Sequence, residues 1–235
     1  MRALDTALHG LRTLIADGAL RPGDRLPSEG ELCERLGVSR GSLREAIRML
    51  AALGVLETRH GSGSYVGELR AADLIGSLSL TVGLLPMAGV LELTELRRVL
   101  EPHAAALAAA RIDQVTVERL GRVLDEIEAS EDFEIHSRLD HQFHMMISGV
   151  AGNAALTSLI DVLRSRSRAY RIPDAHDAAE LKMHSDEGHR AILRGLAAAD
   201  PVAASAAASA HVAYTEYWVR RYSNVDVPSP EPGSS

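Results

Sequence analysis

The chain has 235 residues and a formal net charge of −7, which argues against a protein that is basic throughout. Hydrophobic residues make up 46% but aromatic residues only 3%, so the core is built from Leu, Ala, Val and Ile, a mixture that favours helices over a β-sandwich. The single cysteine, Cys33, excludes an internal disulfide and a Cys-based zinc finger.

The first two predicted elements are helices. Apolar residues recur at helical spacing from Leu4 onward, and Gly18 ends the pattern. After a turn, Ser28 stands three residues before Glu31, which is the spacing of a capping box. A short second helix is therefore expected as far as about Leu36.

A third helix and a hairpin complete the N-terminal part. Ser39 caps the third helix, which ends before Gly54. The strand-like segments VLETR and SYVGEL then flank residues 60–63, which are small and glycine-rich. Two short helices joined by a tight glycine turn and followed by a hairpin predict a winged helix-turn-helix over residues 1–68.

The rest of the chain reads as helix, which predicts a mainly α protein. Helices are expected near residues 71–84, 90–111, 116–130, 132–150, 153–170, 176–199 and 201–222. Together they predict an antiparallel bundle of six to seven helices over residues 71–222, followed by a disordered Pro- and Ser-rich tail at 223–235. Because no apolar run approaches ~20 residues and Met1–Gly10 lacks a signal segment, we expect a cytoplasmic protein with no membrane contact.

The start of the third helix carries side chains suited to DNA, namely Ser39, Arg40, Ser42 and Arg44. An arginine there can bond a guanine edge through two parallel hydrogen bonds, and the wing tip at His60 and Gly61 is small enough to touch phosphate or a minor groove. Residues 1–70 carry 10 Arg against 9 acidic residues, a balance that still allows DNA binding if the arginines gather on one face. A lone arginine would more simply solvate the helix, but here caps, glycines and arginines fit together.

These motifs resemble the GntR family of regulators over residues 4–66. The stretch LRPGDRLPSEGELCERLGVSRGSLREAIRMLAALGVLETRHGSGSYV follows the family pattern almost throughout. The resemblance implies that the six residues named above contact operator DNA. One departure is Gly30, where many members have Arg or another contact residue after Pro-Ser-Glu. One contact of the family is therefore missing, which leaves the operator sequence open.

Four polar residues of the C-terminal part have a composition suited to a metal. Asp140 and His144 are four apart on a predicted helix and so share a face, while His189 and His211 lie on the last two helices. Three imidazoles and one carboxylate suit a first-row divalent ion such as zinc, nickel or manganese, with zinc the first candidate. By spacing alone the pattern also arises by chance, because lone histidines on helices are usually surface or core residues.

The same part of the chain resembles the FCD ligand-binding domain of FadR-like GntR regulators. The matching pieces are LRRVLEPHAAALAA at 96–109, LDHQFHMMI at 139–147, EGHRAILRGLAAAD at 187–200, and His211. In many members an Asp and three His at the matching positions bind a metal, and this chain fills all four positions. Members that bind an acyl-CoA lack this set, so the resemblance disfavours a fatty acyl ligand.

Arg97 matches an arginine of the family that often holds a ligand carboxylate. Its alternative role is a structural ion pair with Glu101, one helical turn away. The two resemblances together imply a homodimeric repressor, not an enzyme. Its affinity for operator DNA would be controlled by a small carboxylate effector at the metal site.

Three alternatives remain open at this point. The His/Asp cluster could serve a metal-dependent hydrolase, although the sequence has no H-E-x-x-H motif. The C-terminal part could only dimerise, with a structural metal. Cys33 could act as a redox switch, but a role as a small buried hydrophobic residue is simpler because no second cysteine can resolve it.

Overall fold

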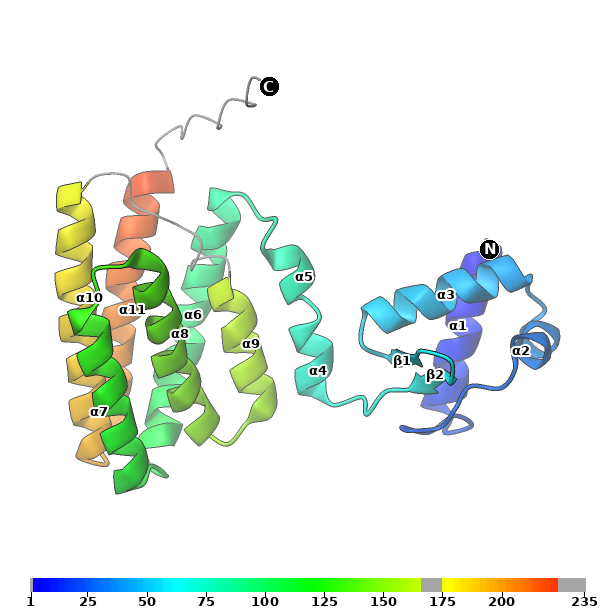
Figure 1. Ribbon diagram of the computed structural model, residues 1–235, viewed down its shortest axis with the longest axis horizontal. Coiled ribbons are helices and arrows are strands. Elements are labelled where there is room, and N and C mark those ends of the chain that lie inside the picture. The colour runs from blue at the N-terminus through cyan, green and yellow to red at the C-terminus, as the bar shows by residue number, and fades with distance from the viewer. Residues whose placement is uncertain (1, 166–174, 224–235) are drawn as a thin grey trace, which may run out of the picture. The chain divides into compact units, whose positions relative to one another are not determined.

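The computed structural model describes residues 2–165 and 175–223, and these form helices and one small antiparallel hairpin (Figure 1). Their contacts divide the chain into two compact units, Met1–Leu78 and Ser79–Ser235. The mainly α fold expected from the sequence, a winged helix-turn-helix followed by a helical bundle, is confirmed. The tail predicted at 223–235 lies outside the described residues from 224 onward, as do residues 166–170 of the helix predicted at 153–170.

The N-terminal unit contains the helix-turn-helix and the wing. Helix α2 (Glu29–Leu36) is followed by α3 (Arg40–Ala52), and α1 (Ala3–Ala16) packs chiefly against α3. Strands β1 (Leu56–Arg59) and β2 (Gly63–Val66) pair antiparallel to form the wing.

Local sequence sets the ends of α2 and α3. The Ser28 hydroxyl accepts the backbone N–H of Glu31 at 3.3 Å, while the Glu31 carboxylate accepts the backbone N–H of Ser28 at 2.9 Å. This is the capping box expected from the sequence. Gly37 ends α2 at a φ of 65°, a left-handed conformation that glycine adopts without strain.

The core of the N-terminal unit is aliphatic. Its buried members are Ala7, Leu11, Leu14, Leu20, Leu26, Leu32, Leu43, Ala46, Leu50, Leu56 and Val66. Cys33 is half-buried and packs against this cluster, which favours the hydrophobic role considered for it. Because α3 turns Leu43, Ala46 and Leu50 inward, its opposite face is exposed.

The helix predicted at 71–84 is instead two short helices, α4 (Ala71–Gly76) and α5 (Ser79–Val82). The break follows Gly76, where the Ser77 hydroxyl donates to the carbonyl of Leu74 at 2.7 Å. Glycine and serine both disfavour a helix interior, since glycine lacks a side chain and serine hydrogen-bonds nearby backbone. Helical periodicity alone missed this interruption.

The C-terminal unit is a bundle whose long helices run alongside one another (Figure 1). They are α6 (Met87–Ala109), α7 (Gln114–Ala129), α8 (Phe133–Val150), α9 (Ala154–Ser165), α10 (Ala175–Ala197) and α11 (Pro201–Ser223). Helix α11 packs chiefly against α6 and α10, α7 against α8 and α10, and α9 against α6 and α8. The contacts therefore bring α6, α8, α10 and α11 around one interior.

Small residues allow these helices to approach closely. A Cβ added at Gly195 of α10 would lie 2.6 Å from the backbone nitrogen of Ala204 of α11. The main core combines alanines with larger buried residues such as Phe143, Leu120 and Ile192. Among the described residues, no helix has both the length and the apolar character needed to cross a membrane.

Candidate functional site

The N-terminal end of α3 places two predicted DNA-contact residues in its cap. The Ser39 hydroxyl accepts the backbone N–H of Ser42 at 3.2 Å, and the two hydroxyl oxygens lie 3.0 Å apart. Arg40 is the first residue of the helix and is exposed. The cap therefore fixes the start of the helix, from which Arg40 extends into solvent.

Arg44 is exposed but is held by a partner from α2. Its Nε donates to both carboxylate oxygens of Glu29, at 2.8 and 3.0 Å. The hydrogen bond from Arg44 lowers the pKa of Glu29 below its usual value. Arg40, Arg44 and Arg48 follow one another at four-residue intervals, so they form a row on the exposed face of α3.

His60 and Gly61 lie in the turn between the two strands, as the sequence predicts. Gly61 has a φ of 70°, which a side chain would strain. Behind the turn, the hydroxyls of Ser62 and Tyr65 lie 2.7 Å apart, and the Arg59 guanidinium stands 4.2 Å from the centroid of the Tyr65 ring. These contacts stiffen the wing and leave its tip exposed.

The structure brings together the four C-terminal residues singled out in the sequence. Asp140 and His144 come from α8, His189 from α10 and His211 from α11, and one ligand atom of each lies within 4.8 Å of the others. The Nε2 atoms of His144 and His189 are 3.2 Å apart. The Asp140 carboxylate approaches them at 3.7 and 3.1 Å, respectively.

Burial and neighbouring groups shift the pKa values of Asp140, His144 and His211. Burial, followed by the nearby Arg164 charge, lowers the pKa of His144 to about 4. Burial and the neighbouring imidazoles hold the pKa of His211 well below its usual value. Burial opposes ionisation of Asp140, but Arg164, His189 and His144 together outweigh it, so the pKa of that carboxyl lies well below its usual range. Neutral imidazoles and an ionised carboxylate are the forms that bind a metal ion.

The cluster fits a divalent cation. Imidazole nitrogens and a carboxylate oxygen converge in a buried interior, and a cation is the partner that such a donor set suits. The Nδ1 atom of His189 is buried without a hydrogen-bond partner in the described part of the chain. Gly188 makes room for the cluster, because a Cβ there would lie 2.7 Å from Nδ1 of His211.

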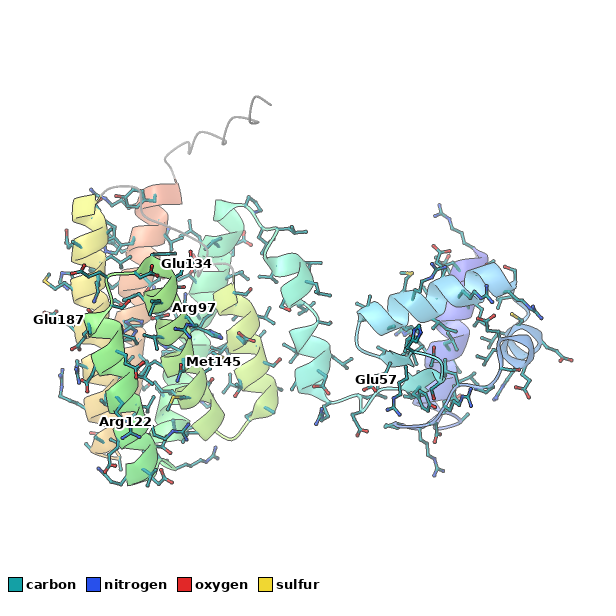
Figure 2. All side chains as sticks on the ribbon, viewed as in Figure 1. Glu57, Arg97, Arg122, Glu134, Met145 and Glu187 are labelled. Carbon is teal, nitrogen blue, oxygen red and sulfur yellow. The ribbon has the colours of Figure 1, made fainter. Side chains whose placement is uncertain are left out.

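A buried charge network supports the metal-binding cluster. Glu101 accepts from Nε of Arg97 at 2.6 Å and lies 3.2 Å from Nδ1 of His144. Arg164 of α9 donates to both oxygens of Glu101 at 3.1 Å and to Asp140 at 2.5 Å. The Arg97–Glu101 ion pair considered from the sequence is therefore present, within the bundle where Figure 2 labels Arg97.

Sequence reasoning missed Arg164. It lies 24 residues from Asp140 and 63 from Glu101, and no local pattern links it to either residue. A small cavity of about 10 Å³ lies beside the network and is lined in part by Glu101, His144 and Ser148. That volume is about enough for one water molecule, so a larger ligand requires the surrounding side chains to move.

Comparisons with known proteins agree with both units. Residues 5–66 match the family described as bacterial regulatory proteins, gntR family, and residues 92–214 match the FCD domain. HTH-type transcriptional regulator LutR of Bacillus subtilis (strain 168) is 30% identical over 212 residues, which cover 86% of this chain and 94% of the relative.

Two further matches extend over most of the chain. The Glc operon transcriptional activator of Escherichia coli (strain K12) is 30% identical over 218 residues, covering 88% of this chain and 85% of the relative. The solved structure of Streptococcus agalactiae GntR superposes with a TM-score of 0.61 at 30% identity, covering 92% of this chain and 99% of that one. Relatives named as regulators of transcription argue against the hydrolase alternative.

Proposed function

Since this chain belongs to the GntR family of DNA-binding transcription regulators and carries an FCD effector domain, we propose that a small carboxylate, bound at a metal site in its C-terminal bundle, controls its affinity for operator DNA. The observation that carries this proposal is the convergence of Asp140, His144, His189 and His211. They form a buried, metal-competent interior in the same chain as an arginine-bearing recognition helix.

We assign operator contact to the start of α3 and to the wing tip. Arg40 and Arg44 extend from the exposed face of α3, where a guanidinium can bond a guanine edge. Ser39 and Ser42 would contact phosphate near the helix start, and His60 and Gly61 would approach the backbone or the minor groove. A homodimer would place two such helices about one DNA turn apart, on a pseudo-palindromic operator in the cytoplasm.

At the second site, the one carboxylate and three imidazoles of the cluster would hold a divalent cation, with zinc the first candidate. When bound, such an ion supplies an electrophilic position for a carboxylate oxygen of the effector. Arg97 and Arg164 contribute buried positive charge nearby and would pair with that carboxylate. An effector that binds one arrangement of the dimer better than another shifts the DNA-binding equilibrium.

The sensing role is tested by a thermal-shift screen of small carboxylates on the full chain, with and without a chelator. At least one acid should raise the unfolding midpoint of the metal-loaded protein and lose this effect in chelator. If no acid raises the unfolding midpoint, or if every acid raises it equally with and without chelator, the protein is not a metal-assisted sensor. If the C-terminal domain only dimerises around a structural metal, the acids should either leave the midpoint unchanged or raise it equally with and without chelator.

The sense of regulation is tested on duplexes selected by the protein from a random-sequence library. We propose repression, so the active acid should weaken binding to the selected duplex and restore transcription from a promoter that carries it. Tighter binding in the presence of the acid would instead identify an activator, or a repressor for which the acid is a co-repressor. Failure to select any sequence would contradict the DNA-binding role itself.

A further inference from the structure

A groove of about 790 Å³ hollows the N-terminal unit between α3 and the wing. The loop before α2, the middle of α3 and both strands line it, and its polar edges include Arg25, Glu29, Arg44 and Arg48. Of the six residues expected from the sequence to contact DNA, Arg44 alone lines the groove. The groove therefore adjoins the proposed base-reading end of α3 and shares only Arg44 with it.

The groove carries an uncompensated positive charge. Arg44 and Glu29 neutralise each other across a distance of 2.8 Å. Arg25 and Arg48 are both exposed, and within residues 2–165 and 175–223 neither forms an ion pair with a carboxylate. The two guanidinium groups thus line an open groove whose one lining carboxylate, Glu29, is already paired with Arg44.

Backbone contacts hold both arginines at the edge of the groove. Next to Arg25, the N–H of Leu26 donates to the carbonyl of Ser64 at 2.8 Å, which ties this loop to β2. Gly63 makes room for the side chain, because a Cβ there would lie 3.2 Å from Nε of Arg25. On the other side, Nε of Arg48 donates to the carbonyl of Arg44 at 3.4 Å.

We propose that Arg25 and Arg48 form a phosphate clamp that binds the sugar-phosphate backbone of duplex DNA. This inference rests on the proposed DNA-binding function and extends it to residues outside the recognition-helix start. The choice of DNA follows from position, since Arg48 continues the row of Arg40 and Arg44 along the exposed face of α3. A guanidinium suits a phosphodiester because its planar donors match two phosphate oxygens.

A phosphate clamp has a signature that a base contact lacks. Each phosphate neutralised by an arginine releases condensed counterions, so the logarithm of affinity falls with the logarithm of salt concentration by a slope of about 0.9 per phosphate. Removal of the clamp weakens binding to every sequence alike. An arbitrary duplex is therefore a sufficient probe, and the operator need not be known.

The test compares Arg25→Gln, Arg48→Gln and the double variant with the unaltered full chain on a DNA duplex of arbitrary sequence, roughly two and a half helical turns long. Arg12→Gln is the matched control, because Arg12 is an exposed arginine of α1 that does not line the groove. Fluorescence anisotropy between about 50 and 200 mM salt gives the slope, and thermal unfolding checks the fold. Each groove variant should lower the slope by about 0.9 for every phosphate that it no longer neutralises, while the control keeps it.

The outcomes separate the clamp from the function on which it rests. Groove variants that keep the full slope, or whose slope falls no further than that of Arg12→Gln, would overturn the clamp. An unaltered protein that binds neither this duplex nor any library sequence would overturn the DNA-binding function. Additive reductions of the slope in the double variant would support two separate phosphate contacts.

Discussion

On α3 of the N-terminal unit, charged side chains lie in solvent, whereas the bundle of the C-terminal unit encloses a charged network. The Arg44 side chain is 60% exposed, but that of Arg164 is only 4% exposed. The surface row suits a large polyanion that approaches from outside. The buried network suits a small ligand and a metal, because charges removed from water interact strongly and must be fully paired.

Because of this difference, substitutions of charged residues have different consequences in the two units. A surface arginine can be removed with little effect on folding, so its removal reports on DNA binding. A buried charge cannot be removed without leaving its partners unpaired, so its removal changes folding and ligand binding together.

The largest effect is expected for the double substitution His144→Ala, His189→Ala. Removal of two of the four ligands should reduce metal from about one ion per chain to near zero, measured by elemental analysis after dialysis. His103→Ala is the matched control, since His103 is exposed on α6, and it should retain full metal. Equal metal content in the double variant and the control would show that the cluster does not bind the ion.

The next effect is expected for Glu101→Leu, which removes the carboxylate shared by Arg97, Arg164 and His144. The free energy of unfolding should fall by about 3–5 kcal/mol, because buried cations are left uncompensated. Urea unfolding in the presence of a chelator measures this change in the free energy of unfolding without a contribution from metal binding. Glu128→Gln, which breaks the surface pair with Arg190, should change stability far less, and an equal decrease would contradict the contrast.

Unlike Glu101→Leu, the double substitution Arg40→Ala, Arg44→Ala should weaken DNA binding and leave stability nearly unchanged. Affinity for a selected operator should fall on the order of tenfold or more for each arginine, while the thermal midpoint stays within roughly 2 °C. Anisotropy and thermal unfolding measure the two effects. Arg122→Ala on α7, labelled in Figure 2, is the control in the other unit and should keep operator affinity. Specific binding retained by the double variant would overturn the assignment of α3.

The smallest effect is expected for Glu29→Gln. This change removes a carboxylate beside the exposed Arg44 and frees that guanidinium, so binding to an arbitrary duplex should tighten about twofold to fivefold at low salt. The thermal midpoint should hardly change, because exposed ion pairs contribute little to stability. Weaker binding would show that Glu29 instead positions Arg44 for DNA.

Local features were the ones that could be predicted from the sequence. The capping box at Ser28 and Glu31, the cap at Ser39 and the turn at His60 and Gly61 each involve residues within a few positions. Their hydrogen bonds form within one turn of the chain, so residue type and spacing are enough. Helical periodicity did not predict the break after Gly76, because it does not register the weak helix propensity of the glycine and serine there.

The order of the long helices, the arginine-bearing face of α3 and the shared face of Asp140 and His144 follow from the amino-acid sequence alone, since helical geometry decides which residues lie together within one helix. Spacing alone could not place His189 and His211 beside that pair, although the family resemblance implied it, and the structure brings all four together. That Arg164 ties Asp140 to Glu101 emerges only from the packed bundle. The tertiary structure also decided that Arg44 is paired while Arg25 and Arg48 face an open groove. Burial and charge pairing depend on side chains from separate elements, and because only packing brings these together, sequence spacing cannot predict them.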